Sequence, residues 1–234
     1  MKVTMDNKPT VWITGASKGI GAAIAELLAE KGFAVAASAR TPITSIHENI
    51  HPFVCDVQSP AEIAQCFQDI CAHLGGVDVL ITNAGVATFA SLVDTTDEAA
   101  DEMLGINLRG MFLSLKSVLP AMIARNSGVI VNILSVAAVK TFTNCAVYSA
   151  TKAGALAMSR SVREEVRAHN VRVIDILAGA TETAIWDDSA RTEFHERMMQ
   201  PTDIAQVVWQ AIELSISGRM VLEEIVVRPK GGDL

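Results

Sequence analysis

The sequence predicts an α/β fold, a doubly wound parallel sheet of about seven strands with helices on both faces. Short apolar segments alternate with longer segments of helical spacing along the whole chain, which is typical of a parallel sheet covered on both sides. Half of the 234 residues are apolar and only 5% are aromatic, a composition that suits buried parallel strands. No Pro-, Gly- or Ser-rich linker interrupts the pattern, so residues 1–234 are expected to form a single domain.

Seven apolar runs have the length and composition of strands. The first ends in a glycine turn, and the third is short and weak. In chain order, the predicted strands are 11–13, 33–39, 51–54, 77–81, 128–134, 171–177 and 225–227.

Five segments place apolar residues at helical spacing. In the first, residues 20, 24, 27 and 28 are apolar, and Gly32 closes the helix in the manner of a C-terminal glycine. In the second, Ile63, Phe67 and Ile70 fall on one side. The predicted helices are 20–31, 60–73, 101–124, 147–168 and 202–216.

Two connections depart from the alternating pattern. Residues 40–50 contain Pro42 and are few for a full crossover helix, so one helix is expected to be truncated or missing. Residues 181–200 have no clear core period and carry Ile185 and Trp186 among charged residues. We interpret this second segment as a mobile lid or substrate-binding loop that contains a short helix.

The charge and the absence of long apolar runs exclude several classes of protein. A formal net charge of -7 argues against a nucleic-acid binder, which would show a basic face, and against a polybasic membrane-surface protein. The segment 1–10 is polar and lacks the apolar core of a signal peptide. No apolar run approaches the roughly 20 residues needed to cross a bilayer. A cytoplasmic protein is therefore expected.

Cysteine and histidine spacings predict no metal site. The 4 cysteines form no CxxC pair, and none of the 5 histidines lies in an HExxH-type frame. We interpret the cysteines as small apolar residues in a reducing compartment.

A glycine-rich turn follows the first predicted strand and opens the first helix. Residues 14–21 read TGASKGIG, so the glycines are spaced GxxxGxG. Glycine permits a tight turn and close approach to a ligand, and a helix N-terminus offers free N–H groups to an anion. The turn could exist without a ligand, but the strand before it and the helix after it favour a phosphate site. The candidate binding residues are Gly15, Ser17, Lys18, Gly19 and Ile20.

The end of the second strand bears on which dinucleotide would bind. An acidic residue there would hold the ribose hydroxyls of NAD, whereas an arginine suits the 2′-phosphate of NADP. The chain has Arg40, no carboxylate at 38–41, and Lys18 in the glycine turn. These residues predict NADP(H), unless both cations are ordinary solvated side chains.

Tyr148 and Lys152 form the most informative pair in the chain. Residues four apart share a helix face, so the phenol and the ammonium are expected side by side. A neighbouring cation would lower the phenol pKa from about 10, toward the pH at which proton transfer is efficient. The alternative is a solvated helix face with an unrelated Tyr and Lys, although Tyr148 is the only tyrosine in the chain.

Taken together, these segments resemble the classical short-chain dehydrogenases/reductases over nearly the whole chain. The Ala39-Arg40 pair resembles the NADP-preferring branch of that family. A Rossmann-like fold and an oxidoreductase activity are what the resemblance implies. It rests on the glycine turn at 14–21, Asp56-Val57, Thr82-Asn83-Ala84-Gly85, Asn107, Ser135, Tyr148 and Lys152.

The resemblance implies a catalytic tetrad. Tyr148 would give a proton to a carbonyl or take one from an alcohol, while Lys152 would hold the nicotinamide ribose and lower the Tyr148 pKa. Ser135 would hydrogen-bond the substrate oxygen. Asn107 would hold a water that links Lys152 to solvent, or satisfy a helix kink, or do both. Further cofactor contacts are implied for Asp56, Val57, Asn83, Ala84, Gly85, Tyr148, Lys152, Gly179, Thr181 and Thr183.

Two departures from the family pattern stand out. The chain has Ala178-Gly179 where the family usually has Pro-Gly, which is expected to loosen the turn that precedes Thr181 and Thr183. The C-terminus also lacks the usual glycine-rich ending, which weakens the analogy to ketoacyl reductases of fatty-acid synthesis. Lys140 would either pair with an anionic substrate group or remain solvated.

The implied function is the NADP(H)-dependent interconversion of a carbonyl and a secondary alcohol on a small, mainly apolar substrate. One alternative is a catalytically silent, dinucleotide-binding regulatory protein, and another is an NAD-preferring alcohol dehydrogenase. Members of the family usually assemble as homodimers or homotetramers through two long helices, here 101–124 and 147–168.

Overall fold

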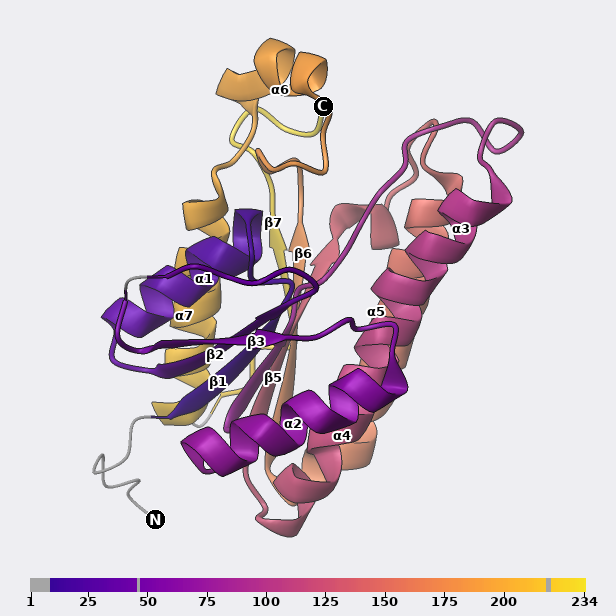
Figure 1. Cartoon of the computed structure of the whole chain (residues 1–234). Coiled ribbons are helices and arrows are strands. Elements are labelled where there is room, and N and C mark those ends of the chain that lie inside the picture. Colours follow the sequence, from indigo (N-terminus) through magenta and orange to yellow (C-terminus); the bar gives the residue numbers. More distant parts are fainter. Residues whose placement is uncertain (1–8, 46, 218–219) are drawn as a thin grey trace.

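Seven parallel strands form one sheet in the computed structural model, which describes residues 9–45, 47–217 and 220–234. The strand order is β3-β2-β1-β4-β5-β6-β7, so the predicted doubly wound parallel sheet is confirmed (Figure 1). The strands are β1 (Thr10–Thr14), β2 (Ala34–Ala39), β3 (Ile50–Val54), β4 (Val79–Thr82), β5 (Gly128–Ser135), β6 (Val171–Ala178) and β7 (Glu224–Val227).

Helices connect the strands, and several carry recognisable caps. Ser59 and Thr96 accept capping hydrogen bonds at the starts of α2 and α3, as short polar residues do at such positions. The α-helices are α1 (Gly19–Glu30), α2 (Pro60–Leu74), α3 (Asp97–Met103), α4 (Met111–Ala124), α5 (Ala146–Val166), α6 (Asp188–Phe194) and α7 (Pro201–Ser217). A π-helical segment, η1 (Leu104–Gly110), and three 3₁₀ turns, η2 (Val136–Ala138), η3 (Arg167–His169) and η4 (His195–Arg197), complete the set.

The sheet buries both of its faces, and alternation along each strand divides the side chains between them. Val11 and Ile13 of β1 belong to an apolar cluster with α1 and α7, whereas Trp12 belongs to a second cluster with α2, α4 and α5. Figure 1 shows these two groups of helices on opposite sides of the sheet. Each fully buried aliphatic side chain contributes about 1.5–3 kcal/mol to folding, so the two clusters supply most of the driving force.

The predicted elements are found, and one of them begins earlier than expected. Residues 40–45 and 47–49 contain no helix, as the short connection with Pro42 predicted. The helix predicted at 101–124 begins earlier, at Asp97, and passes through η1 before continuing as α4. Within 181–200, the expected short helix is α6. Of the polar segment 1–10, residues 1–8 lie outside the described part of the chain.

The strand order reverses between β1 and β4, and such a switch point opens a crevice beyond the carboxyl ends of the strands. The glycine turn follows β1 there, and the loop 83–96 follows β4. Figure 1 shows the end of that loop before α3 at the same end of the molecule as α6. The fold therefore brings the candidate binding segments to one edge of the sheet.

Over the described residues, no helix has the length and apolar character needed to span a bilayer. Across the same residues, no three His, Cys, Asp or Glu side chains gather in a way that could hold a metal ion. The four cysteines are free thiols, three of them buried.

Candidate active site

The glycine turn is shaped by close packing against the loop after β4. Gly15 has a φ of +68°, and a Cβ there would lie 2.7 Å from the Cα of Ala84. Asn83 donates from Nδ2 to the carbonyl oxygens of Thr14, at 3.0 Å, and Gly15, at 2.9 Å. The Thr14 hydroxyl accepts from the backbone N–H groups of Asn83 and Ala84. Asn83 and Thr14 therefore hold the turn in shape, a role for Thr14 that the sequence analysis missed.

The start of α1 fits an anionic ligand. Its N-cap residue, Lys18, makes no side-chain capping hydrogen bond, whereas Ser59, Thr96 and Asp187 cap α2, α3 and α6. The first N–H groups of a helix lack intrahelical partners, and the helix dipole places partial positive charge there. Ser17 and Lys18 are exposed beside them. This donor set matches the pyrophosphate of a dinucleotide.

The segment 181–200 reaches the same turn. Gly19 has a φ of +58°, and a Cβ there would lie 3.2 Å from the Thr183 side chain. Thr181 donates from its hydroxyl to the carbonyl of Gly179 at 3.1 Å. The Gly179 N–H in turn donates to Val227 of β7 at 2.7 Å. The turn after Ala178 is therefore tied to β7 by a backbone hydrogen bond, and the expected loosening stays a prediction.

Arg40, Asp56 and Val57 gather at the far side of the crevice, beyond the ends of β2 and β3. Arg40 is exposed and forms an ion pair with Glu102, with 3.8 Å between Nη1 and Oε1. Asp56 accepts from the N–H of Gln58 at 2.9 Å. Val57 is buried against Gly110, where a Cβ would lie 2.8 Å from Val57 Cγ2. The ion pair of Arg40 with a carboxylate was not foreseen.

Ser135, Tyr148 and Lys152 come together beyond β5, as predicted. Ser135 is the last residue of β5, and the other two lie on the inner face of α5. The Lys152 Nζ atom donates to the Ile133 carbonyl at 3.1 Å and lies 5.8 Å from the centroid of the Tyr148 ring. All three side chains are buried.

The expectation that Lys152 lowers the Tyr148 pKa is wrong for this state of the protein. Burial raises the pKa of Tyr148 to about 12, and the side chain of Ser135 offsets only part of that rise. Burial also lowers the pKa of Lys152 to about 8. Removal from water disfavours both charged forms, and it is the largest cause of the pKa shift of each group. At neutral pH the phenol is therefore firmly protonated.

Asn107 lies inside η1, and its side chain hydrogen-bonds the backbone of the loop that follows β4. Its Oδ1 accepts from the N–H of Val86 at 2.8 Å, and its Nδ2 donates to the Val86 carbonyl at 2.9 Å. Nδ2 also donates to the Thr151 hydroxyl at 3.1 Å. A cavity of about 10 Å³ is lined by both Asn107 and Lys152, which is room for one water. Gly85 borders the same two side chains.

An apolar wall surrounds Tyr148. Ala137 and Cys145 are buried against it, with Phe142 and Ile185 packed around them. The Lys140 side chain remains 46% exposed, and its Nζ pairs with Asp233 at 2.7 Å. The sequence did not indicate Phe89, whose ring centroid lies 5.9 Å from that of Tyr148.

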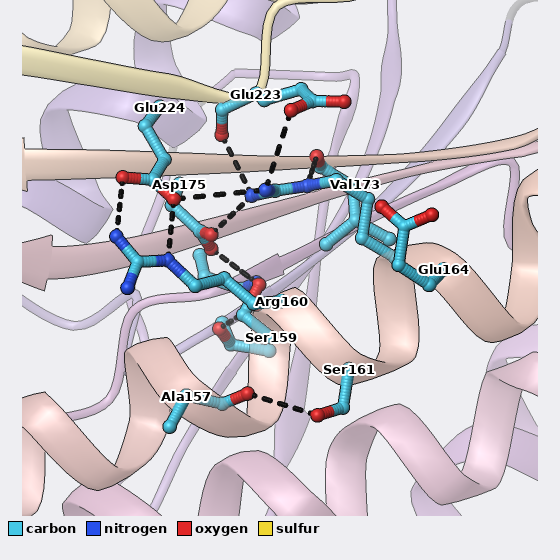
Figure 2. A network of polar contacts seen from close by, with 12 residues as sticks. Ala157, Ser159, Arg160, Ser161, Glu164, Val173, Asp175, Glu223 and Glu224 are labelled. Atoms are coloured by element: carbon cyan, nitrogen blue, oxygen red, sulfur yellow. Dashed lines mark hydrogen bonds and ion pairs between the residues drawn. The ribbon is translucent and has the colours of Figure 1, made fainter.

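A buried polar network on the same face of the sheet was also missed. Thr82, Asn132, Asp175 and Glu224 are register partners across β4, β5, β6 and β7. Asp175 Oδ1 accepts from Asn132 at 2.9 Å and from Ser159 of α5 at 2.6 Å. Figure 2 shows Asp175 between Ser159 and the two glutamates at the start of β7. A polar residue inside each of two apolar runs, Asn132 in VIVNIL and Asp175 in VIDIL, was the available signal.

Arg163 of α5 completes this network. Its Nη2 donates to Asp175 Oδ2 at 2.5 Å and to the Glu223 carbonyl at 2.9 Å. Its Nε donates to the Val173 carbonyl at 3.0 Å. Burial raises the pKa of Asp175, but Ser159, Asn132 and Arg163 all counter that rise.

Comparison with known proteins agrees with this geometry. A family model described as short chain dehydrogenase matches residues 9–193. Sepiapterin reductase of Chlorobaculum tepidum is 33% identical, with 97% of this chain and 98% of that protein covered. Carbonyl reductase family member 4 of Xenopus laevis is 32% identical, with 86% of this chain and 89% of that protein covered.

Solved structures show the same fold. Serine dehydrogenase from Escherichia coli superposes with a TM-score of 0.84 at 25% identity, covering 96% of this chain and 100% of the other. A metagenomic short-chain oxidoreductase in complex with NADP superposes with a TM-score of 0.78 at 30% identity, covering 96% and 98% of the two chains.

Proposed function

Because the chain belongs to the short-chain dehydrogenase family, we propose that it is an NADP(H)-dependent oxidoreductase that interconverts a carbonyl and a secondary alcohol. The convergence of the buried Ser135, Tyr148 and Lys152 side chains beside an apolar cluster carries this proposal. Two similar proteins are named as reductases, which supports the carbonyl-reducing direction. The substrate is small and mainly apolar, and 181–200 is its binding loop.

The protonation states define the roles of the catalytic residues. The Tyr148 phenol is protonated at neutral pH, so its hydroxyl donates a proton to the substrate oxygen while Ser135 hydrogen-bonds the same atom. For alcohol oxidation Tyr148 must act as the base, which becomes easier once positive charge gathers beside it. Lys152 orients the site and resupplies the proton through the cavity it shares with Asn107.

Bound NADP(H) would supply or accept the hydride, and this chain's residues would position it. The start of α1, with Gly15, Ser17, Lys18, Gly19 and Ile20, would hold the pyrophosphate. Arg40 would face the 2′-phosphate. The remaining contacts proposed are Asp56, Val57, Asn83, Ala84, Gly85, Tyr148, Lys152, Gly179, Thr181 and Thr183.

The activity is tested by NADPH consumption with a panel of diketones, aldehydes and sepiapterin. Tyr148→Phe should lower kcat by about 10²–10⁴, the range that a general acid contributes, while leaving the urea midpoint near that of the wild type. Ser149→Ala, on the same helix turn, is the matched control. Tight NADPH binding without turnover of any carbonyl would instead favour the silent regulatory protein.

The preference for NADP over NAD needs its own experiment. Because Arg40 is already paired with Glu102, an NAD-preferring alcohol dehydrogenase stays an alternative. Arg40→Ala should weaken NADPH binding by roughly 10- to 100-fold, the loss of a charge-assisted hydrogen bond, and NADH binding far less. Lys116→Ala, a lysine of α4, serves as the control for charge. Equal losses for the two dinucleotides would reject a role for Arg40 at the 2′-phosphate.

We further propose a cytoplasmic homodimer or homotetramer that assembles through α4 and α5. Leu104 and Phe112, at the junction of η1 and α4, are 43% and 45% exposed, which suits a helix face that packs against another copy. Light scattering should give a mass two or four times that of the chain. A monomer at micromolar concentration would contradict this assembly.

A further inference from the structure

Three aromatic rings from separate parts of the chain meet over the active site. Phe89 lies in the loop between β4 and α3, Trp186 lies in the segment 181–200, and Tyr148 lies on α5. The Phe89 and Trp186 rings stack, with centroids 5.0 Å apart and planes inclined by 22°. Phe89 also meets Tyr148 edge to face, with centroids 5.9 Å apart and planes inclined by 67°. The two loops therefore close over the phenol through an aromatic contact.

The indole of Trp186 is held in a fixed orientation. Its Nε1 donates to the Thr181 carbonyl at 3.1 Å, and its backbone N–H donates to the Thr183 carbonyl at 3.2 Å. The loop that carries Phe89 is tied at Thr88, whose N–H donates to Met103 Sδ at 3.4 Å. Phe89 is 41% exposed. One ring is thus a fixed wall and the other is open to solvent at the entrance.

The two cations near this entrance, Lys140 and Arg228, are already paired with a carboxylate. Lys140 lies over the ring of Phe142, 5.1 Å from its centroid, and Phe142 packs in the apolar cluster of Tyr148. However, Lys140 is paired with Asp233 at 2.7 Å, and Arg228 is paired with the same carboxylate at 2.9 Å. An anionic substrate would have to displace Asp233 to reach these cations. This arrangement favours a neutral substrate.

We propose that Phe89 and Trp186 are the specificity-determining pair of this site and select neutral carbonyl compounds whose carbonyl is attached to a flat conjugated ring. The inference rests on the proposed function, because a carbonyl oxygen held by Tyr148 and Ser135 places its substituent beneath the two rings. Aromatic pairs contribute about 0.5–1.5 kcal/mol beyond their buried area. Each ring therefore accounts for about a 2- to 10-fold preference in kcat/KM for a conjugated substituent over an alkyl one.

The test compares two vicinal diketones that differ only in carrying a phenyl or an ethyl group. The ratio of their kcat/KM values should fall by about 2- to 10-fold in Phe89→Leu and in Trp186→Leu, which keep an apolar side chain but lose the ring. Trp186→Phe should restore the ratio to within about twofold of the wild type. Leu92→Ala, an exposed residue of the same loop, should leave the ratio unchanged. A wild-type ratio that both leucine variants retain would overturn the inference.

A binding measurement separates this inference from the proposed function. The phenyl diketone should quench tryptophan fluorescence in the wild type, and most of that quenching should disappear in Trp186→Phe. Quenching without any NADPH consumption would refute the proposed function and leave the aromatic pair supported. Turnover of both diketones at a ratio that no ring variant alters would refute the aromatic pair and leave the function supported. Absence of both quenching and turnover would refute both.

Discussion

Helix α5 carries two buried ionisable sites that differ in how many polar partners their charged groups have. Tyr148 and Lys152 lie near its start, and their buried charged forms have few partners, so the pKa values of both move toward the neutral states. Arg163, near its end, is as buried as Lys152, yet it makes bonds to Asp175, Val173 and Glu223. A buried charge with a full set of partners stays ionised and is costly to unpair, whereas one with few partners is poised to gain or lose a proton.

The largest expected effect is on catalysis. Lys152→Met should lower kcat by about 10²–10⁴ if the residue maintains proton transfer at Tyr148. The same change should raise the free energy of unfolding near pH 7 by about 2–3 kcal/mol, because a poorly solvated ammonium is removed. Urea unfolding and NADPH consumption measure the two effects. A variant that loses both stability and activity would show that Lys152 is instead a structural cation.

The matched change at the other site should act in the opposite direction. Arg163→Met should lower the free energy of unfolding by about 3–5 kcal/mol, because it leaves the Asp175 carboxylate buried without its cation. The folded fraction should retain its kcat, since Arg163 touches no residue of the proposed tetrad. Replacing Asp175 as well, with Leu, should recover part of the loss. A loss of less than about 1 kcal/mol in the free energy of unfolding would contradict this, because it would mean that Arg163 and Asp175 interact only weakly.

The pH dependence of stability sharpens the comparison. The folded pKa of Lys152, about 8, lies below the ordinary value of 10.5, so between these values the unfolded chain binds more protons at this site. Stability should therefore rise with pH in this window in the wild type relative to Lys152→Met. The gap between the two proteins should shrink by about 1–2 kcal/mol from roughly pH 8 to pH 9.5. An equal gap at both values would contradict the lowered pKa.

The smallest effect is expected at the cofactor end of the crevice. Glu102 competes for Arg40 through an exposed ion pair, and such pairs are worth about 0–1 kcal/mol. Glu102→Gln should therefore tighten NADPH binding by about 2- to 5-fold and leave NADH binding unchanged. Glu98→Gln, in the same helix, is the control. Unchanged affinity for both dinucleotides would mean that Glu102 does not restrain Arg40.

The fold was predictable because it rests on patterns that are local in sequence. Alternating strand and helix periods specified the sheet, and the truncated connection at 40–50 followed from its length and Pro42. The start of the long helix at Asp97 was missed because Thr96, its cap, lies well before the first apolar residues of the predicted period. No local pattern indicated the π-helical segment around Asn107. The Asn107 side chain accepts its hydrogen bond from Val86, which lies far away in the sequence, in the loop after β4.

The electrostatics of the site were less predictable than its residues. Spacing alone placed Tyr148 beside Lys152, but the sign of the pKa shift depends on how much water the fold removes, and that is a property of the packed structure. The Arg40–Glu102 contact and the stacking of Phe89 on Trp186 join segments far apart in the chain. Such contacts are set by tertiary packing and have no counterpart in local spacing.

The central claim is that the fold removes the catalytic phenol from water and thereby raises its pKa. Tyr148 is the only tyrosine in the chain, so the ultraviolet absorbance of tyrosinate reports this one group. The folded protein without dinucleotide should titrate at about 12, as against about 10 for the urea-unfolded chain, with circular dichroism confirming the folded state at each pH. A folded-state midpoint at or below that of the unfolded chain would contradict the account.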